Sequence, residues 1–272
     1  MFYLLFGVVS RIFSNSFLNV FQKLLTDSGE KASVINFYTY LGLTVIGLLI
    51  LPCLVLNPML LTNVAIMGVL GALGNYFIIK ALSVGDLSEL APINCYKPVI
   101  AVIMGILVLK EMPKLFAIVG ILFIITGTFV LFGKKINHSQ ALFYRFLALL
   151  FSGTEAVFIK KVILLSNIES AFLFWAISGL LFSLLITINK PLKISKVNIK
   201  YQILLILFAA LMQYSTNYVF AKMNVAYALA LFQMSVVVSV FLGVNIFKEK
   251  HLFRKLISSA IMIFGAVLII LN

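Results

Sequence analysis

The chain has 272 residues, of which 63% are hydrophobic and 11% are charged, and its mean hydropathy is +1.16. About a quarter of the residues of a soluble domain are charged, so this composition excludes a soluble globular protein. The formal net charge of +13 would suggest nucleic acid in a soluble protein. In a membrane protein it reflects lysines in loops that face anionic headgroups, and no nucleic-acid partner is expected.

Apolar runs of about 20 residues, long enough to cross a hydrocarbon core of about 30 Å, recur along the chain. They predict an all-α integral membrane protein with ten transmembrane helices. The connections are too short to hold a soluble domain, so any chemistry must occur between the helices. The predicted spans are 2–24, 32–56, 61–84, 87–109, 113–132, 141–165, 168–189, 198–222, 225–247 and 252–271.

The two halves of the chain resemble each other. "VFQKLLTDSGEKASVINFYTYLGL" (20–43) aligns with "VFIKKVILLSNIESAFLFWAISGL" (157–180), and "NYFIIKAL" (75–82) aligns with "NYVFAKMN" (217–224). These matches predict an N-terminal five-helix repeat at 1–135 and a C-terminal repeat at 136–272. Because five is odd, the second half is expected to enter the membrane from the opposite side. Inverted repeats usually bind solute near the midplane around a central cavity, which favours transport over a scaffold role.

The first span carries a polar stripe. Arg11, Asn15, Asn19 and Gln22 are spaced by four, four and three residues, which places them along one helix face. For any one of them, a hydrogen bond between helices, worth about 0.6 kcal/mol, is the simpler interpretation. As a group they predict a substrate-binding surface.

The fourth predicted span contains a lysine near its centre, in "LAPINCYKPVIAVIMGILVL" (90–109). A lysine at a helix centre costs about 2.5–3.5 kcal/mol on insertion scales, so Lys97 should face the interior of the bundle. Pro98 has no amide hydrogen and breaks the helix there, leaving the Asn94 carbonyl without its usual partner. Asn94 shares a helix face with Lys97. Lys97 is predicted to bind an anionic group of the substrate, and an internal ion pair is the alternative.

Glu155, in the sixth predicted span, is the carboxylate closest to the middle of any span. It is the obvious ion-pair partner for Lys97, and Arg11 is a second cation at depth. Glu155 could also couple transport to protons. Both roles are left open, and they are compatible if the substrate displaces one member of a pair.

Further polar residues fall in the other predicted spans. Candidate substrate-binding residues are Asn75, Tyr76, Gln213, Tyr214, Asn217, Tyr218 and Gln233. Tyr38 and Trp175 occupy equivalent positions near span ends, and we interpret them as members of the interfacial aromatic belt.

The stretch "GDLSELAPINCYKPVIAVIMGILVLKEMPKLFAIVGILFIITGTFVLF" (85–132) resembles the helix-four and helix-five signature of EamA-type transporters of the drug/metabolite transporter superfamily. The shared features are Ala91–Pro92, Pro98 and Glu111. The resemblance implies a central cavity formed by helices one, three, four, six, eight and nine, and export of amino acids or other metabolites. Lys97 and Glu89 depart from the usual pattern, so no particular substrate follows. We expect location in the bacterial cytoplasmic (inner) membrane.

Membrane orientation has two opposing indications. Most Lys and Arg residues fall on the face opposite the termini, so the positive-inside rule places both termini outside. The resemblance implies termini in the cytoplasm. Labelling a terminal tag in intact cells distinguishes the two.

The sequence therefore predicts a secondary transporter, an exporter of a small solute such as an amino acid or another organic solute with an anionic group. It is expected to work by alternating access, as a monomer in the lipid bilayer, without cofactor or metal. A lipid-carrier or lipid flippase of the same superfamily is the alternative, followed by a channel. An enzyme is not expected, because both histidines fall in loops and no reactive constellation lies at depth.

Overall fold

The computed structural model describes residues 2–50, 54–55, 57–97, 99–100, 115–132, 139–188, 194–223 and 225–270. Within these ranges the chain forms helices and no strands, which confirms the predicted helical class. The elements are α1 (Phe2–Asp27), α2 (Ala32–Ile50), α3 (Leu60–Leu82), α4 (Leu87–Leu90), η1 (Pro92–Tyr96), α6 (Leu115–Phe132), α7 (Ser139–Leu165), α8 (Ile168–Thr187), η3 (Lys196–Asn198), α9 (Ile199–Lys222), α10 (Val225–Phe232), α11 (Ser235–Phe247) and α12 (Leu252–Ile270).

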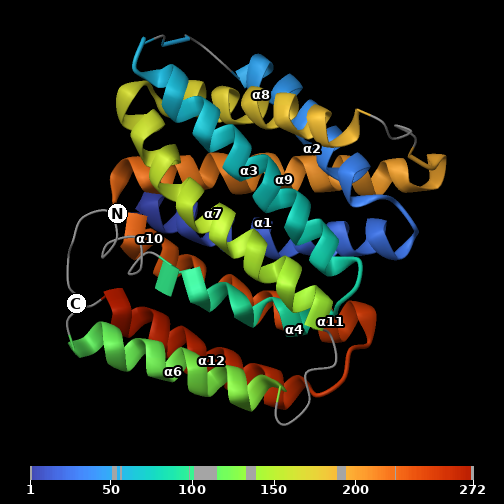
Figure 1. The fold of residues 1–272 in the computed structure, drawn as a ribbon, viewed down its shortest axis with the longest axis vertical. Coiled ribbons are helices and arrows are strands. Elements are labelled where there is room, and N and C mark those ends of the chain that lie inside the picture. Colours follow the sequence, from blue (N-terminus) through green and yellow to red (C-terminus); the bar gives the residue numbers. More distant parts are fainter. Residues whose placement is uncertain are drawn as a thin grey trace.

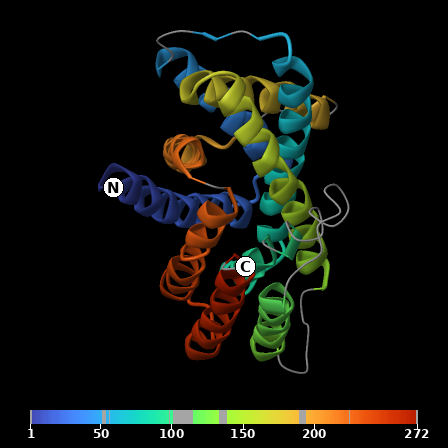
Figure 2. The ribbon, with the colours of Figure 1, turned by 90° about the vertical axis from the view of Figure 1, so that its left-hand side faces the viewer.

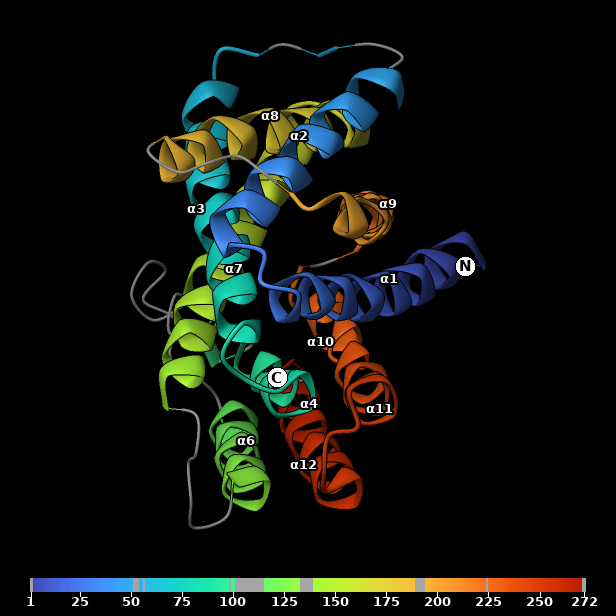
Figure 3. The ribbon, with the colours of Figure 1, turned by 90° about the vertical axis from the view of Figure 1, so that its right-hand side faces the viewer.

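The helices are stacked along the longest axis of the molecule. α2 and α8 lie at one end of this axis, and α6 and α12 lie side by side at the other (Figure 1). Views from the two sides show α9 next to α1, with α3 and α7 running together beside them (Figures 2 and 3). The middle of the stack, where α1, α3, α7, α9 and the broken helices meet, holds the cavity described below.

Among the described residues, five helices are long and apolar enough to cross a membrane. They are Tyr3–Asp27, Ala32–Ile50, Leu60–Leu82, Ile168–Thr187 and Ile199–Lys222. Two shorter apolar helices, Ile118–Leu131 and Ser235–Phe247, belong to the same set of predicted spans. The length and composition of these helices indicate that the chain is an integral membrane protein. The count of ten spans stays a prediction.

Helices of the two halves pair reciprocally. The first helix of the N-terminal half, α1, packs against α9, the third helix of the C-terminal half. The third helix of the N-terminal half, α3, packs against α7, the first of the C-terminal half. Equivalent helices also meet each other, as α2 meets α8 and α6 meets α12. The first helix of each half thus packs against the third helix of the other half.

Equivalent glycines set the close approach of α6 and α12. A methyl group added at Gly127 would overlap Met262 and come within 3.0 Å of the Ser258 carbonyl oxygen. One added at Gly265 would lie 2.5 Å from the Gly120 carbonyl oxygen. Small residues of this kind let two helix backbones pack directly in a membrane, where lipid gives no hydrophobic driving force for association.

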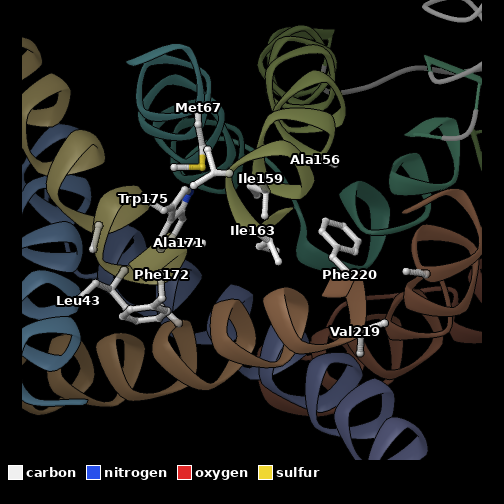
Figure 4. Close-up of a cluster of buried hydrophobic side chains, with 14 of the residues drawn as sticks. Leu43, Met67, Ala156, Ile159, Ile163, Ala171, Phe172, Trp175, Val219 and Phe220 are labelled. Carbon is white, nitrogen blue, oxygen red and sulfur yellow. The ribbon is translucent and has the colours of Figure 1, made fainter. Parts of the chain in front are cut away.

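An apolar cluster lies where α2, α3, α7, α8 and α9 converge. Leu43, Met67, Phe172 and Phe220 are among its buried members, and Figure 4 shows the side chains of this cluster. This cluster holds the helices of the two halves together beside the cavity.

The fourth and ninth predicted spans are both interrupted, whereas the sequence predicted a break in the fourth span alone. In the N-terminal half, α4 ends at Leu90 and a 3₁₀ turn follows at Pro92–Tyr96. Pro92 explains the break, because it cannot donate the helical hydrogen bond to Ser88. The predicted break at Pro98 lies outside the described residues.

In the C-terminal half, α10 ends at Phe232 and α11 begins at Ser235, although no proline is present. The Gln233 side-chain amide donates to the Leu229 carbonyl oxygen at 2.8 Å. Asn245 makes the same kind of bond to the Phe241 carbonyl oxygen inside the continuous helix α11, so this bond alone does not explain the break. The alignment of the halves places this break opposite η1.

Candidate functional site

A cavity with two adjoining lobes lies between the two broken helices and α1, α3, α7 and α9. The wide lobe has a volume of about 110 Å³ and the narrow lobe about 40 Å³. A cavity needs a volume of about 10–15 Å³ to hold one water molecule, so both lobes can hold water. Both lobes are lined by Arg11, Asn15, Asn19, Ile78, Lys97, Leu229 and Phe232.

The remaining lining residues differ between the lobes. The wide lobe adds Leu18, Thr39, Tyr40, Leu43, Gly71, Asn75, Ser152, Glu155, Ala156, Ile159, Trp175, Ala209, Met212, Gln213, Thr216 and Phe220. The narrow lobe adds Asn94, Arg145, Gln233 and Ser235. These residues include members of all six helices expected around the cavity, together with α2 and α8, which were not expected there. No lining residue belongs to the described parts of α6 or α12.

Arg11 projects from α1 into both lobes. Its Nε donates to the Thr216 hydroxyl at 2.7 Å, and its guanidinium carbon lies 4.9 Å from the centre of the Phe232 ring. One terminal nitrogen, Nη1, is buried and has no hydrogen-bond partner among the described residues. An unsatisfied charged donor beside a cavity is expected where a ligand oxygen completes its bonding.

Lys97 follows directly after η1 and lines both lobes. Its backbone amide donates to the Asn94 carbonyl oxygen. The sequence predicted that this carbonyl would lack a partner, because Pro98 has no amide hydrogen, but the 3₁₀ turn provides one. Asn94 itself lines the narrow lobe. Lys97 and Asn94 are thus together at the cavity, as predicted from their spacing.

Arg145 is a functional candidate that the sequence analysis missed, because it was counted with the charges of the connecting loops. The structure places it in α7 with 4% of its surface exposed. Its Nε donates to the Leu90 carbonyl oxygen at 3.2 Å, and the residue lines the narrow lobe. Its position inside the predicted span 141–165 was the signal that pointed to burial.

Glu155 accepts a hydrogen bond of 2.5 Å from the Trp175 indole nitrogen. Trp175 is 7% exposed and lines the wide lobe, so its assignment to the aromatic belt is wrong. No ion pair joins Lys97 and Glu155, since the ion pairs of the described residues are Lys23–Asp27 and Lys255–Glu249. Gly71 makes room for this arrangement, because a methyl group there would overlap the Glu155 carboxylate.

Two further hydroxyl groups stand beside Glu155. The Tyr40 and Ser152 side chains line the wide lobe, and neither hydroxyl has a hydrogen-bond partner within the described part of the chain. The Tyr40 ring packs 5.1 Å from the Trp175 ring. This lobe therefore combines an acceptor, free hydroxyls and aromatic faces.

Several predicted site residues are tied into hydrogen bonds at the cavity wall. Asn75 accepts from Gln22 at 2.9 Å and donates to Asn36 at 2.7 Å. Asn15 donates to the Ser235 hydroxyl at 3.3 Å, linking α1 to the start of α11. These bonds show that the wall residues also fix the packing of helices.

Gln213 and Asn217 are the polar pair predicted in the eighth span. Hydrogen bonds tie both of them into the packing of the helices. Gln213 lines the wide lobe and donates to Asn217 at 3.0 Å. Asn217 is fully buried and donates to the Ile168 carbonyl oxygen at 3.3 Å. Asn217 lies behind the cavity wall rather than on it.

The predicted tyrosines lie away from the cavity. The Tyr214 hydroxyl donates to Glu169 at 3.0 Å near the outer surface. Tyr218 packs against α1 at Gly7, and the Tyr76 ring lies near Lys80. None of the three lines either lobe.

Chemically, the cavity presents charged donors and one carboxylate to a space large enough for water. Arg11, Lys97 and Arg145 are suited to binding carboxylate or phosphate oxygens. Within the described ranges, no group of three or more His, Cys, Asp or Glu side chains could hold a metal ion.

Comparison with known proteins agrees with this architecture. The sequence model of the EamA-like transporter family matches residues 1–133 and 139–271, one match for each half. One crystal structure, described only as that of a protein, is similar over 98% of this chain and 96% of its own, with a TM-score of 0.68 and 13% sequence identity. At that identity the likeness concerns the fold alone. No curated protein matches the chain.

Proposed function

Because the chain belongs to the EamA-like transporter family, we propose that it is a secondary transporter that exports a small organic solute carrying an anionic group. Amino acids are included in this class. The solute would bind in the two-lobed cavity between the halves of the chain.

One observation carries the proposal: Arg11 and Lys97 line a cavity large enough for water, and neither forms an ion pair with a carboxylate of the described residues. Charged side chains at membrane depth are costly, and they are usually retained for a function. A structural role would be better served by a neutralising partner, as Lys255 has in Glu249.

The architecture around the cavity supports alternating access. Both halves contribute a broken helix to the narrow lobe, through Asn94 and Lys97 on one side and Gln233 and Ser235 on the other. Discontinuous helices at the junction of two repeats are typical of solute sites in secondary transporters. The reciprocal pairing of α1 with α9 and α3 with α7 fits an inverted repeat whose halves rock about the cavity.

Glu155 is the group that we infer to exchange a proton during the cycle. It lies on the cavity wall, so solvent can reach it in at least one conformation. Glu155→Gln keeps an acceptor for Trp175 and removes the titrating group. Net export in proteoliposomes should then lose its dependence on a pH gradient, while exchange of labelled solute persists. A gradient response equal to that of the wild type would contradict this role.

The experiment that tests the proposal is a stability screen followed by flux. Purified protein is heated with amino acids, organic acids, phosphorylated metabolites and choline, and solutes that raise its melting temperature are tested in proteoliposomes. Uptake of labelled solute that requires unlabelled solute on the other side would support a transporter. Flux at channel rates, or movement of labelled lipid with no movement of any solute, would contradict it.

A further inference from the structure

We propose that the solute carries two negative charges on one head group, which binds in the narrow lobe between the broken helices. The inference rests on the proposed function and narrows its substrate class. It follows from how charge is distributed between the two lobes of the cavity.

The narrow lobe is lined by three cations and by no carboxylate among the described residues. Arg11, Lys97 and Arg145 line it, and its other polar side chains, among them Asn94 and Gln233, are neutral. Arg11 and Arg145 each use Nε in a bond to the protein, to Thr216 and to the Leu90 carbonyl respectively. Each guanidinium therefore keeps terminal nitrogens for another acceptor.

The carboxylate of the cavity belongs to the wide lobe. Glu155 lines that lobe and not the narrow one, and the Trp175 indole holds it. Counting both lobes, three cations and one carboxylate leave a formal charge of +2 (3 − 1 = 2). A buried charge without a partner is unfavourable. A head group with two negative charges balances the cavity, whereas a single carboxylate leaves one cation without a partner.

The sizes of the lobes fit a compact head with a longer tail. The narrow lobe, about 40 Å³, accommodates a small group such as a phosphate or two carboxylates on one carbon. The wide lobe, about 110 Å³, has room for the remainder of the solute beside Tyr40, Ser152 and Glu155. A tail with a hydroxyl or amino donor would meet acceptors there. The head chemistry is thus a phosphomonoester or a pair of neighbouring carboxylates.

Binding can be read directly, because Trp175 is the only tryptophan of the chain and lines the wide lobe. Tryptophan emission of the full-length protein in detergent is titrated with malonate, whose two carboxylates share one carbon, and with malonamate, which has the same skeleton and one negative charge. Methyl phosphate and dimethyl phosphate form the second pair. In whichever pair matches the head chemistry, the doubly charged member should bind about tenfold more tightly or better, consistent with one additional charged hydrogen-bonded contact.

Removal of one cation should abolish this preference. Arg145→Gln keeps a donor for the Leu90 carbonyl, and it should weaken the doubly charged member about tenfold while leaving the singly charged one nearly unchanged. Lys97→Met serves as a second variant if Arg145→Gln does not fold. Lys161→Gln, at an exposed position of the same helix α7, is the control that should keep the preference.

The outcomes separate this inference from the proposed function. Equal binding of both members in both pairs, with flux of some other solute, would overturn the doubly charged head and leave the transporter intact. A preference shared by the Arg145→Gln and Lys97→Met variants would also overturn it. If no solute of any charge binds or crosses, both proposals fail.

Discussion

Two groups of buried charge differ in how they are neutralised. At the contact of α4 with the turn between α11 and α12, Lys255 is 1% exposed and pairs with Glu249 at 3.6 Å. Glu249 also accepts from the backbone amides of Leu87 and Ser88, each at 2.9 Å, and Ser88 bonds both charged groups through its hydroxyl. In the cavity, by contrast, neither Arg11 nor Lys97 forms an ion pair with a carboxylate of the described residues.

The contrast separates charges that hold helices together from charges that we propose to bind a ligand. The Glu249–Lys255–Ser88 cluster satisfies its members within the protein and ties the halves together at α4. The cations of the cavity are satisfied only in part, by a hydroxyl, a carbonyl oxygen and an aromatic ring. Disturbing the first group should therefore affect stability, and disturbing the second should affect binding.

The largest effect is expected from Glu249→Gln. The substitution leaves Lys255 buried without a negative partner and weakens the bonds to the start of α4, which should cost about 3–5 kcal/mol of stability. Unfolding of the purified protein by heat or denaturant measures the loss. The double variant Glu249→Met, Lys255→Met should regain most of it, because neither charge then remains. Unfolding of Glu249→Gln at the wild-type midpoint would show that the cluster does not hold the halves.

The next effect concerns Lys97→Met, which should impair transport without impairing the fold. Loss of a charged hydrogen bond to the solute, worth about 1.5–3 kcal/mol, predicts flux lower by roughly 10- to 150-fold at limiting substrate. The free energy of unfolding should be unchanged or higher, since an unpaired cation leaves the interior. Proteoliposome flux and denaturation, with Lys161→Met as control, measure the two. Undiminished flux would remove Lys97 from the site.

Gly71→Ala should have a smaller effect, centred on the Glu155–Trp175 bond. The added methyl group would overlap the carboxylate and come within 2.9 Å of the Trp175 indole nitrogen, so the bond must break or the helices must separate. Overpacking of this kind costs about 1–3 kcal/mol. Gly74→Ala is the matched control, because its methyl group would make ordinary contacts at 3.4 Å or more. Trp175 emission should shift in the first variant only, and identical spectra would contradict the assignment.

The smallest effect is expected for Asp27→Asn. Asp27 pairs with Lys23 at 2.8 Å, but its side chain is 43% exposed. Lys23 also donates to the Leu82 carbonyl oxygen at 3.0 Å, so it keeps a partner. Exposed pairs are worth about 0–1 kcal/mol, and the midpoint of unfolding should hardly move. A loss as large as that of Glu249→Gln would mean that burial does not distinguish the two pairs.

The sequence predicted the family, the helical class and much of the cavity wall. The stripe of Arg11, Asn15 and Asn19 was readable because polar residues at helical spacing in an apolar run must share a face. Lys97 could be predicted for a different reason, because a charged side chain in the middle of a span is unfavourable in lipid and must face the protein. Local periodicity suffices for residues of this kind.

Other parts of the site depend on contacts between distant segments, which periodicity does not contain. Trp175 lies near the end of a predicted span, where an aromatic residue is typical of the interface. Its place on the cavity follows from the crossing of α8 with α3 and α7. Arg145 and Lys255 lie near the ends of predicted spans, where a charged side chain is expected to reach water, yet neighbouring elements cover both. The tyrosines at 214 and 218 fell on the opposite side of α9 from the cavity.

The break between α10 and α11 differs in kind from the one at Pro92. A pyrrolidine ring interrupts a helix permanently, because it lacks the amide hydrogen and crowds the preceding turn. Every residue between Phe232 and Ser235 keeps its amide hydrogen, so the covalent structure of this segment permits a continuous helix. If the halves rock about the cavity as we propose, the break between α10 and α11 can straighten, whereas the break at Pro92 stays fixed.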